Sequence, residues 1–187
     1  MKPVIFNRYF GLRAVCAAVM VAATALTANA AFVARPAPSG LSMARPKKVY
    51  YCSVSNAALN FGNYNIFSTG PDTASTTIVI PNGGCVFSNK IRIKISLSQG
   101  NSSPNYNPRT LVNGASSLNY NLYLDNAYST IWGNGTNGTQ EFSQTLTCPY
   151  PFCVISGGVP VYGSIPALQN VPPGIYTDTI TITLQFN

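Results

Sequence analysis

The sequence predicts an all-β protein, folded as an antiparallel β-sandwich. From Tyr50 to the C-terminus, apolar and polar residues alternate along several segments, and clusters of Gly, Pro, Asn and Ser separate these segments. Alternation with a period of two places one face of a strand against a core and the other face in water. No stretch of a dozen residues after Ala31 has a helical period. About seven or eight short strands at this spacing indicate a sandwich.

Three segments alternate most clearly, at 91–97, 118–125 and 179–186. The apolar positions of the last segment are Ile180, Ile182, Leu184 and Phe186. Weaker strands are expected at Leu59–Tyr64, Thr76–Ile80, Gln140–Leu146 and Val159–Ile165. Turn-forming clusters lie between the strands at Pro81–Gly84, Gly100–Pro108, Gly133–Gly138 and Asn170–Gly174. These residue types favour turns because they supply the backbone angles or local hydrogen bonds that turns need.

Residues 1–30 have the order of a secretory signal peptide. Three basic residues precede or flank the start of an apolar run at 14–28. Ala28 and Ala30 are small residues at the two positions that a signal peptidase reads, so the mature chain is expected to begin at Ala31. The apolar run is shorter than the roughly 20 residues that span a bilayer, and no later segment supplies one. We therefore expect a secreted protein with no membrane span in its mature chain.

The mature chain divides into a short extension and one domain. Residues 31–48 contain three prolines among small residues, as is typical of a linker or tail, and residues 49–187 carry the β pattern. The net charge of +7 originates outside this domain, because from Val49 onward four basic residues accompany four acidic ones. A nearly neutral domain lacks the basic patch that binds nucleic acid, so no nucleic-acid partner is expected.

Four cysteines remain in the expected mature chain, namely Cys52, Cys85, Cys148 and Cys153. An even number in a chain bound for an oxidising compartment favours disulfides. Four cysteines allow three pairings, of which we favour Cys52–Cys85 with Cys148–Cys153. The first closes a loop of about 33 residues. If its only effect is to lower the entropy of the unfolded chain, it stabilises the folded state by roughly 3–4 kcal/mol. A zinc site is the alternative, and it is disfavoured because the chain has no C-x-x-C motif and no histidine.

The sequence is poor in groups that catalyse reactions. It has no histidine, the usual general base, and its four carboxylates are scattered. Asp125 and Asp178 each lie near a strand boundary, where an acid more often caps a turn. No phosphate-loop or nucleophile-elbow motif occurs, and nothing singles out a Ser–Lys dyad. We expect a structural protein rather than an enzyme, without a metal or any other cofactor.

Six short motifs follow one another between Cys52 and the C-terminus. They are Cys52–Ser55 with Leu59–Tyr64, a strand ending at Cys85, Ser96–Gly100 with Pro108–Leu111, Leu118–Asp125 with Ile131–Gly133, Val161–Pro166, and Gly174–Thr179. In this order they resemble the spore coat protein U domain, which is shared with subunits of archaic chaperone–usher pili. Each motif alone is weak, and the specificity of the resemblance comes from their occurrence together.

The resemblance implies an immunoglobulin-like sandwich that lacks its final strand. In pilus members of the family a periplasmic chaperone lends a strand to the open groove, and the next subunit's N-terminal extension replaces it at an outer-membrane usher. By this resemblance, the strand carrying Ile180, Ile182, Leu184 and Phe186 borders an acceptor groove. The implied partners are a periplasmic pilus chaperone, an outer-membrane usher and sibling subunits. Backbone hydrogen bonds would pair the added strand, and its alternate apolar side chains would fill pockets.

The N-terminal extension limits this scheme. Residues 31–51 offer little alternation between prolines, which cannot donate to a strand ladder, so we expect the chain to be a better strand acceptor than donor. The leading hypothesis is a structural subunit of a surface pilus or a spore-coat-like layer. The alternative is a surface adhesin or carbohydrate-binding module, with Tyr106, Trp132 and Tyr150 as possible contacts because aromatic rings stack on sugars.

Overall fold

The computed structural model describes residues 3–8, 51–87, 90–147 and 153–186. These ranges contain strands and no helix, so no helix among them could cross a membrane. The strands are β1 (Pro3–Arg8), β2 (Tyr51–Cys52), β3 (Ala58–Asn60), β4 (Asp72–Phe87), β5 (Lys90–Leu97), β6 (Arg109–Asn113), β7 (Ser116–Tyr123), β8 (Phe142–Thr147), β9 (Cys153–Ile165) and β10 (Asp178–Phe186).

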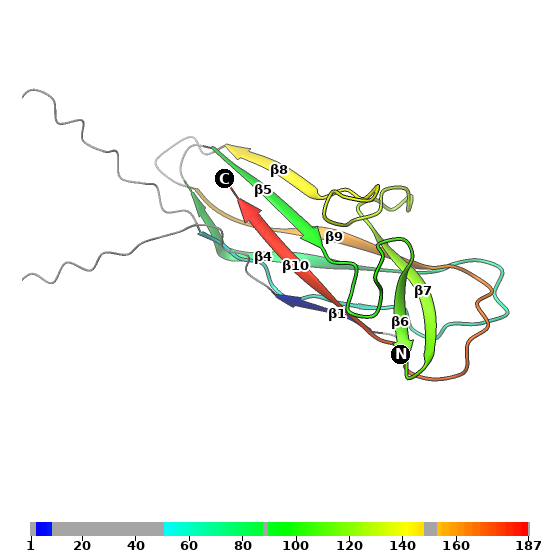
Figure 1. Ribbon diagram of the computed structural model, residues 1–187. Coiled ribbons are helices and arrows are strands. Elements are labelled where there is room, and N and C mark those ends of the chain that lie inside the picture. Colours follow the sequence, from blue (N-terminus) through cyan, green and yellow to red (C-terminus); the bar gives the residue numbers. More distant parts are fainter. Residues whose placement is uncertain (1–2, 9–50, 88–89, 148–152, 187) are drawn as a thin grey trace, which may run out of the picture.

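The strands form two sheets that lie face to face (Figure 1). One sheet has the order β3-β1-β10-β5-β8 and the other the order β2-β4-β9-β7-β6. All pairings between these strands are antiparallel except that of β1 with β10, which is parallel. The predicted all-β, immunoglobulin-like sandwich is therefore confirmed.

The core lies between the two sheets and is built from the alternating residues that the sequence indicates. In β5 the apolar Ile91, Ile93 and Ile95 are buried while Arg92 between them is exposed. Buried residues from both sheets meet in one cluster, which includes Leu59, Ile78, Leu97, Leu111, Leu118, Tyr120, Leu122, Val161, Ile165, Ile180 and Ile182. Burial of this apolar area is the main contribution to the stability of the domain.

A glycine in β9 allows β3 to come close to the opposite sheet. A Cβ atom at Gly163 would lie 2.5 Å from Cδ2 of Leu59 and 2.6 Å from Cζ of Phe61. Real Cβ atoms do not approach other atoms so closely, so only glycine leaves room for these two buried side chains.

The turn prediction at Pro81–Gly84 is wrong, because these residues lie inside β4. Ile80 pairs with Gly157 and Cys85 pairs with Ile155, so five steps along β4 oppose two steps along β9. A bulge absorbs such extra residues without ending the strand. The weak strand expected at Leu59–Tyr64 is shorter, since β3 spans Ala58–Asn60. β6 was not predicted, because its polar residues obscure the period of two.

The disulfide predicted between Cys52 and Cys85 is present and joins the paired residues of β2 and β4. The Cys148–Cys153 pairing falls outside the described side chains. Of the predicted signal peptide the structure describes Pro3–Arg8, which form β1, and the whole of the 31–48 extension lies outside the described residues.

Candidate strand-acceptor site

One strand position separates β3 from β10, and β1 occupies it (Figure 1). β1 pairs in parallel with β10 from Val4 opposite Asp178 to Arg8 opposite Ile182. On its other side it pairs antiparallel with β3, from Pro3 opposite Asn60 to Ile5 opposite Ala58. β3 and β10 therefore belong to one sheet only through the segment that lies between them.

The backbone of β10 presents two edges. The carbonyl groups of Thr179 and Thr181 accept hydrogen bonds from backbone N–H groups of the loop 98–101, at 3.1 and 3.0 Å respectively. Alternate residues of a strand direct their backbone groups to the same edge. The N–H and C=O groups of Ile180 and Ile182 consequently point to the other edge, toward β1.

The side chains of β10 alternate as predicted. Ile180, Ile182 and Leu184 are buried against the core, and Phe186 is partly buried and packs against the same core. The threonines between them are only partly buried. The four residues predicted for a groove strand thus share the core-facing side of β10. The edge of β10 that faces away from β5 is paired with β1.

Asp178 fixes the start of β10. Its Oδ1 accepts hydrogen bonds from the backbone N–H groups of Asn101, Ser102 and Thr179 at 3.0, 3.2 and 2.8 Å, and its Oδ2 accepts the hydroxyl of Tyr120 at 2.7 Å. The carboxylate therefore ties a loop and β7 of the opposite sheet to the first residue of the groove strand. The sequence-based assignment of Asp178 as a cap at a strand boundary is confirmed.

Asp125 is a second cap of the kind that the sequence predicts. Its Oδ1 accepts hydrogen bonds from the N–H groups of Ala127 and Ser129, and its Oδ2 accepts the N–H of Thr130. The hydrogen bonds from Ser129, above all that of its backbone N–H, and from Thr130 hold the pKa of Asp125 below its ordinary value of 3.8. This carboxylate lies on the surface and closes a turn rather than forming part of a reactive site.

Arg109 crosses the interior beside Asp178 with no exposed surface. Its guanidinium donates to the carbonyl of Ser98 through Nε and Nη2 at 3.1 and 2.9 Å. Nη2 also donates to the carbonyl of Trp132 at 2.6 Å, and Nη1 donates to Oδ1 of Asn121 at 2.7 Å. The ring of Tyr106 lies 5.2 Å from the guanidinium carbon, within range of a cation–π contact. One side chain thus joins β6, β7 and the loops that follow β5 and precede β8.

Burial shifts the ionisation of this cluster. Removal from water lowers the pKa of Arg109, and the neighbouring tyrosines and Asp178 oppose that shift. Burial also raises the pKa of Tyr120 well above 10.0, and the charge and hydrogen bond of Asp178 raise it further. The hydrogen bonds of Arg109 and Tyr120 are made to other groups of the domain, namely the carbonyls of Ser98 and Trp132, Oδ1 of Asn121 and Oδ2 of Asp178.

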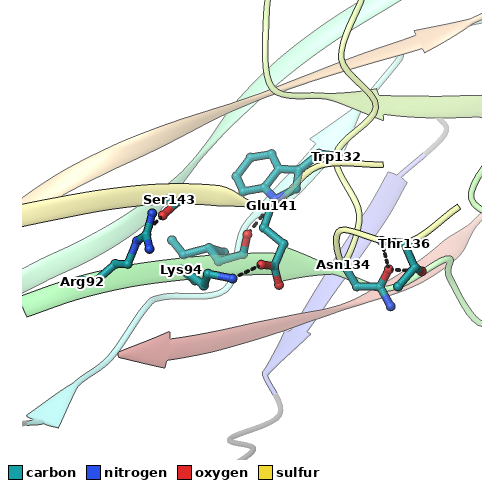
Figure 2. A network of polar contacts seen from close by, with 8 residues as sticks. Arg92, Lys94, Trp132, Asn134, Thr136, Glu141 and Ser143 are labelled. Atoms are coloured by element: carbon teal, nitrogen blue, oxygen red, sulfur yellow. Dashed lines mark hydrogen bonds and ion pairs between the residues drawn. The ribbon is translucent and has the colours of Figure 1, made fainter. Parts of the chain in front are cut away.

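The expectation that Trp132 and Tyr106 contact an external sugar is wrong, because both side chains are buried. Trp132 has no exposed surface. Its Nε1 donates to the carbonyl of Ile95 in β5 at 2.9 Å, and this bond is among the dashed lines of Figure 2. Tyr106 is 7% exposed and lies against Arg109. Nearby on the surface, Lys94 and Glu141 form an ion pair at 2.6 Å. Tyr150 lies outside the described residues.

The end of the sandwich where β3 stops and β10 begins is apolar and open. Loops 63–67 and 171–174, with Leu118 and Tyr176, line a pocket there of about 350 Å³. Phe67 is 83% exposed and Ile175 is 65% exposed. Phe67 lines this pocket, and Ile175 lies in the chain between the lining residues Gly174 and Tyr176.

Comparison with known proteins places these features in a family. The family model of the Spore Coat Protein U domain matches residues 40–183. The chain belongs to this family. It is also 32% identical to Protein U of Myxococcus xanthus over 196 aligned residues, which cover 90% of this chain and 99% of that protein. Membership assigns the chain to a class of structural proteins of spore coats and bacterial surfaces.

The residues of the buried polar cluster lie within the motifs that resemble the Spore Coat Protein U domain. Arg109 lies in the motif around Pro108–Leu111, Tyr120 and Asn121 lie in Leu118–Asp125, and Asp178 lies in Gly174–Thr179. Sequence reasoning assigned none of these residues a common site. The signal that was available was a charged residue at the start of a short apolar segment in a chain with few charges. Among the described residues, no three His, Cys, Asp or Glu side chains gather as they would around a metal ion.

Proposed function

We propose that this chain is a structural subunit of a secreted surface assembly, an archaic chaperone–usher pilus or a spore-coat-like layer. In this assembly a strand of another protein occupies the position between β3 and β10. The observation that carries the proposal is that β1, which holds this position, belongs to the predicted signal peptide. Removal of residues 1–30 takes this strand away and leaves β3 and β10 without the segment that joins them.

The vacated position suits an added strand. The N–H and C=O groups of Ile180 and Ile182 point toward it, and buried backbone groups without partners are costly. An incoming backbone satisfies these groups, and its alternate side chains complete the core beside Ile180 and Leu59. The strand position therefore supplies both the affinity and the register of a subunit contact.

The same feature accounts for the partners that we propose. An open strand edge beside a buried apolar face invites aggregation, so a secreted subunit of this kind needs a periplasmic chaperone before it meets its neighbours. An outer-membrane usher and sibling subunits then follow from the family scheme. The subunit passes through the periplasm to the cell surface or an extracellular fibre or coat, and the apolar loop end with Phe67 and Ile175 offers a further subunit contact.

An adhesin function at the predicted aromatic residues is not proposed. A sugar-binding ring must expose one face to solvent, whereas Trp132 packs inside the sandwich and Tyr106 packs on Arg109. The described residues that are exposed and aromatic are better explained by contacts between subunits, since the family is structural.

The test compares two exported forms of the chain, each processed by the signal peptidase. One is the natural mature chain, and the other carries a short C-terminal tail of alternating valine and threonine behind a glycine-containing turn, so that it can fold back beside β10. We expect the natural chain to form oligomers or aggregates and the tailed chain to be a soluble monomer. Light scattering after size-exclusion chromatography measures this difference.

A tail of the same length with two prolines is the matched control, because proline cannot donate to the ladder. We expect the proline tail to behave like the natural chain. A natural mature chain that is a stable monomer, with the Ile180 and Ile182 amides protected from hydrogen exchange, would show that no partner strand is needed and would refute the proposal.

A further inference from the structure

We propose that the outer face of strands β5 and β8 binds an acidic polysaccharide through the carboxylates of its sugars. Although the domain is nearly neutral, its basic residues are not spread over the surface. Of the four in the domain, Arg109 is buried. The other three are Lys90, Arg92 and Lys94, and all of them lie on β5. This face lies outside the strand-acceptor position, so it adds a ligand to the proposed function.

The three cations share the face of β5 that points away from the core. Ile91 and Ile93, which alternate with them, are buried, and successive residues of a strand point to opposite faces. Lys90 and Arg92 are exposed, and Lys94 is partly exposed. Alternate residues lie about 7 Å apart along a strand, so the cations form a row about 13 Å long.

Strand β8 places hydroxyl groups beside this row. The cations stand opposite Ser143, Thr145 and Thr147, which are exposed. Residues directly opposite each other in neighbouring antiparallel strands share a face, with Cβ atoms about 4.5–5.5 Å apart. A hydroxyl group both donates and accepts hydrogen bonds, as the hydroxyl groups of a sugar do. The face therefore offers cations for carboxylates next to hydroxyls for the sugar rings.

Two of the cations are available to a ligand. Lys94 pairs with Glu141 at 2.6 Å, whereas no described acidic side chain pairs with Lys90 or Arg92 (Figure 2). Nε of Arg92 donates to Oγ of Ser143 at 3.2 Å, which orients the guanidinium. In the described part of the chain, no group accepts a hydrogen bond from Nη1 or Nη2 of Arg92. A guanidinium binds a carboxylate through two parallel N–H···O bonds, and these two nitrogens can supply them.

The composition of the face favours a polysaccharide over a nucleic acid. Proteins hold single-stranded nucleic acids by stacking the bases on aromatic side chains. The outward-facing residues of β5 and β8 are lysine, arginine, serine and threonine, with no aromatic ring among them. A strand added between β3 and β10 extends the sheet within its plane, so it does not cover this face.

The experiment measures binding of the exported mature chain to immobilised polygalacturonate by surface plasmon resonance. Neutral dextran and duplex DNA are the comparison surfaces. One variant combines Lys90→Gln with Arg92→Gln. The matched control, Lys47→Gln with Lys48→Gln, removes the same charge from the N-terminal extension. A third variant, Arg92→Lys, keeps the charge but not the fork of donors.

We expect the natural chain to bind polygalacturonate and not dextran. Loss of both β5 cations should weaken binding roughly tenfold, because charge-assisted hydrogen bonds are lost. Arg92→Lys should weaken it about threefold, and the extension pair should change it less than about twofold.

Equal weakening by the two glutamine pairs would assign binding to net charge, and weakening by the extension pair alone would assign it to the tail. Either result overturns the proposal of a binding face on β5. Equally tight binding to duplex DNA, or no binding of the natural chain to polygalacturonate, overturns it as well. The strand-acceptor proposal is unaffected by each of these results, since its test measures assembly by light scattering.

Discussion

Replacement of Arg109 by methionine tests whether the buried polar cluster holds the domain together. Methionine fills much of the same volume without donating a hydrogen bond. The change removes the Arg109 donors from the carbonyls of Ser98 and Trp132. The Oδ1 atom of Asn121 loses one of two donors and keeps the backbone N–H of Leu122 at 2.9 Å. We therefore expect Arg109→Met to destabilise the folded chain strongly, even though it removes a buried charge.

The magnitude follows from two opposing terms. Each buried acceptor that loses its partner costs about 1–3 kcal/mol. Removal of the desolvation cost of the guanidinium, several kcal/mol, offsets part of this loss. We expect the lost hydrogen bonds to outweigh the recovered desolvation cost and to lower the free energy of unfolding by about 2–4 kcal/mol. Arg109→Lys keeps the charge but not the planar fork of donors, so we expect a decrease of about 2 kcal/mol.

Urea denaturation measures these values, and the fluorescence of the single, buried Trp132 reports on the core. Arg92→Met is the matched control, because Arg92 is exposed on β5 and its Nε donates to Oγ of Ser143 at 3.2 Å, on the surface rather than in the core. Its effect should stay within about 0.5 kcal/mol. An Arg109→Met protein within about 1 kcal/mol of the natural chain would refute the reasoning that these hydrogen bonds outweigh the cost of burying the charge.

Three further predictions concern stability. Replacing Cys52 and Cys85 together by alanine removes a cross-link between residues 33 apart and should lower the free energy of unfolding by about 3–4 kcal/mol; an unchanged denaturation midpoint would contradict this. The raised pKa of Tyr120 means that the folded chain holds this proton more tightly than the unfolded chain. The contribution of Tyr120 to stability should therefore be constant below about pH 10 and fall as the pH rises further, and Tyr120→Phe should weaken this alkaline dependence in thermal melts. A Cβ atom at Gly100 would lie 2.0 Å from Oδ2 of Asp178, at a backbone φ of +100°, so Gly100→Ala should cost at least about 2 kcal/mol; a normal melting temperature would show that the loop yields without cost.

The strands that the sequence predicts well are those with unbroken alternation. Every second residue is apolar in β5, in β7 from Leu118 onward and in β10 from Ile180 onward, and a period of two is a local property that a sequence shows directly. Pro81–Gly84 misled the prediction, because turn-forming residues and a bulge within a long strand have the same composition. The difference depends on whether β9 continues opposite them, which is a property of another part of the chain.

Of the candidate strand-acceptor site, the sequence predicts only the strand β10. Ile180, Ile182, Leu184 and Phe186 follow from alternation, and in the structure they share the core-facing side of β10. Their neighbour across the groove, Leu59 in β3, comes from the beginning of the domain and is linked to them by β1 alone. Trp132 shows the opposite case, since a lone tryptophan in a glycine-rich segment has the composition of a binding loop, and only its contact with Ile95 reveals a core residue.

The sequence by itself predicted a β-sandwich with few charges in its domain, and among three possible cysteine pairings it favoured the one that includes Cys52–Cys85, which the structure confirms. Such properties follow from the period and composition of neighbouring residues. The order of the Spore Coat Protein U motifs indicates the family to which the chain belongs. Only the tertiary structure decided that one strand position lies between β3 and β10, and that Arg109 and Asp178 lie buried beside its start. Both depend on segments far apart in the chain coming together, because a strand edge is complete or open only in relation to the strand beside it.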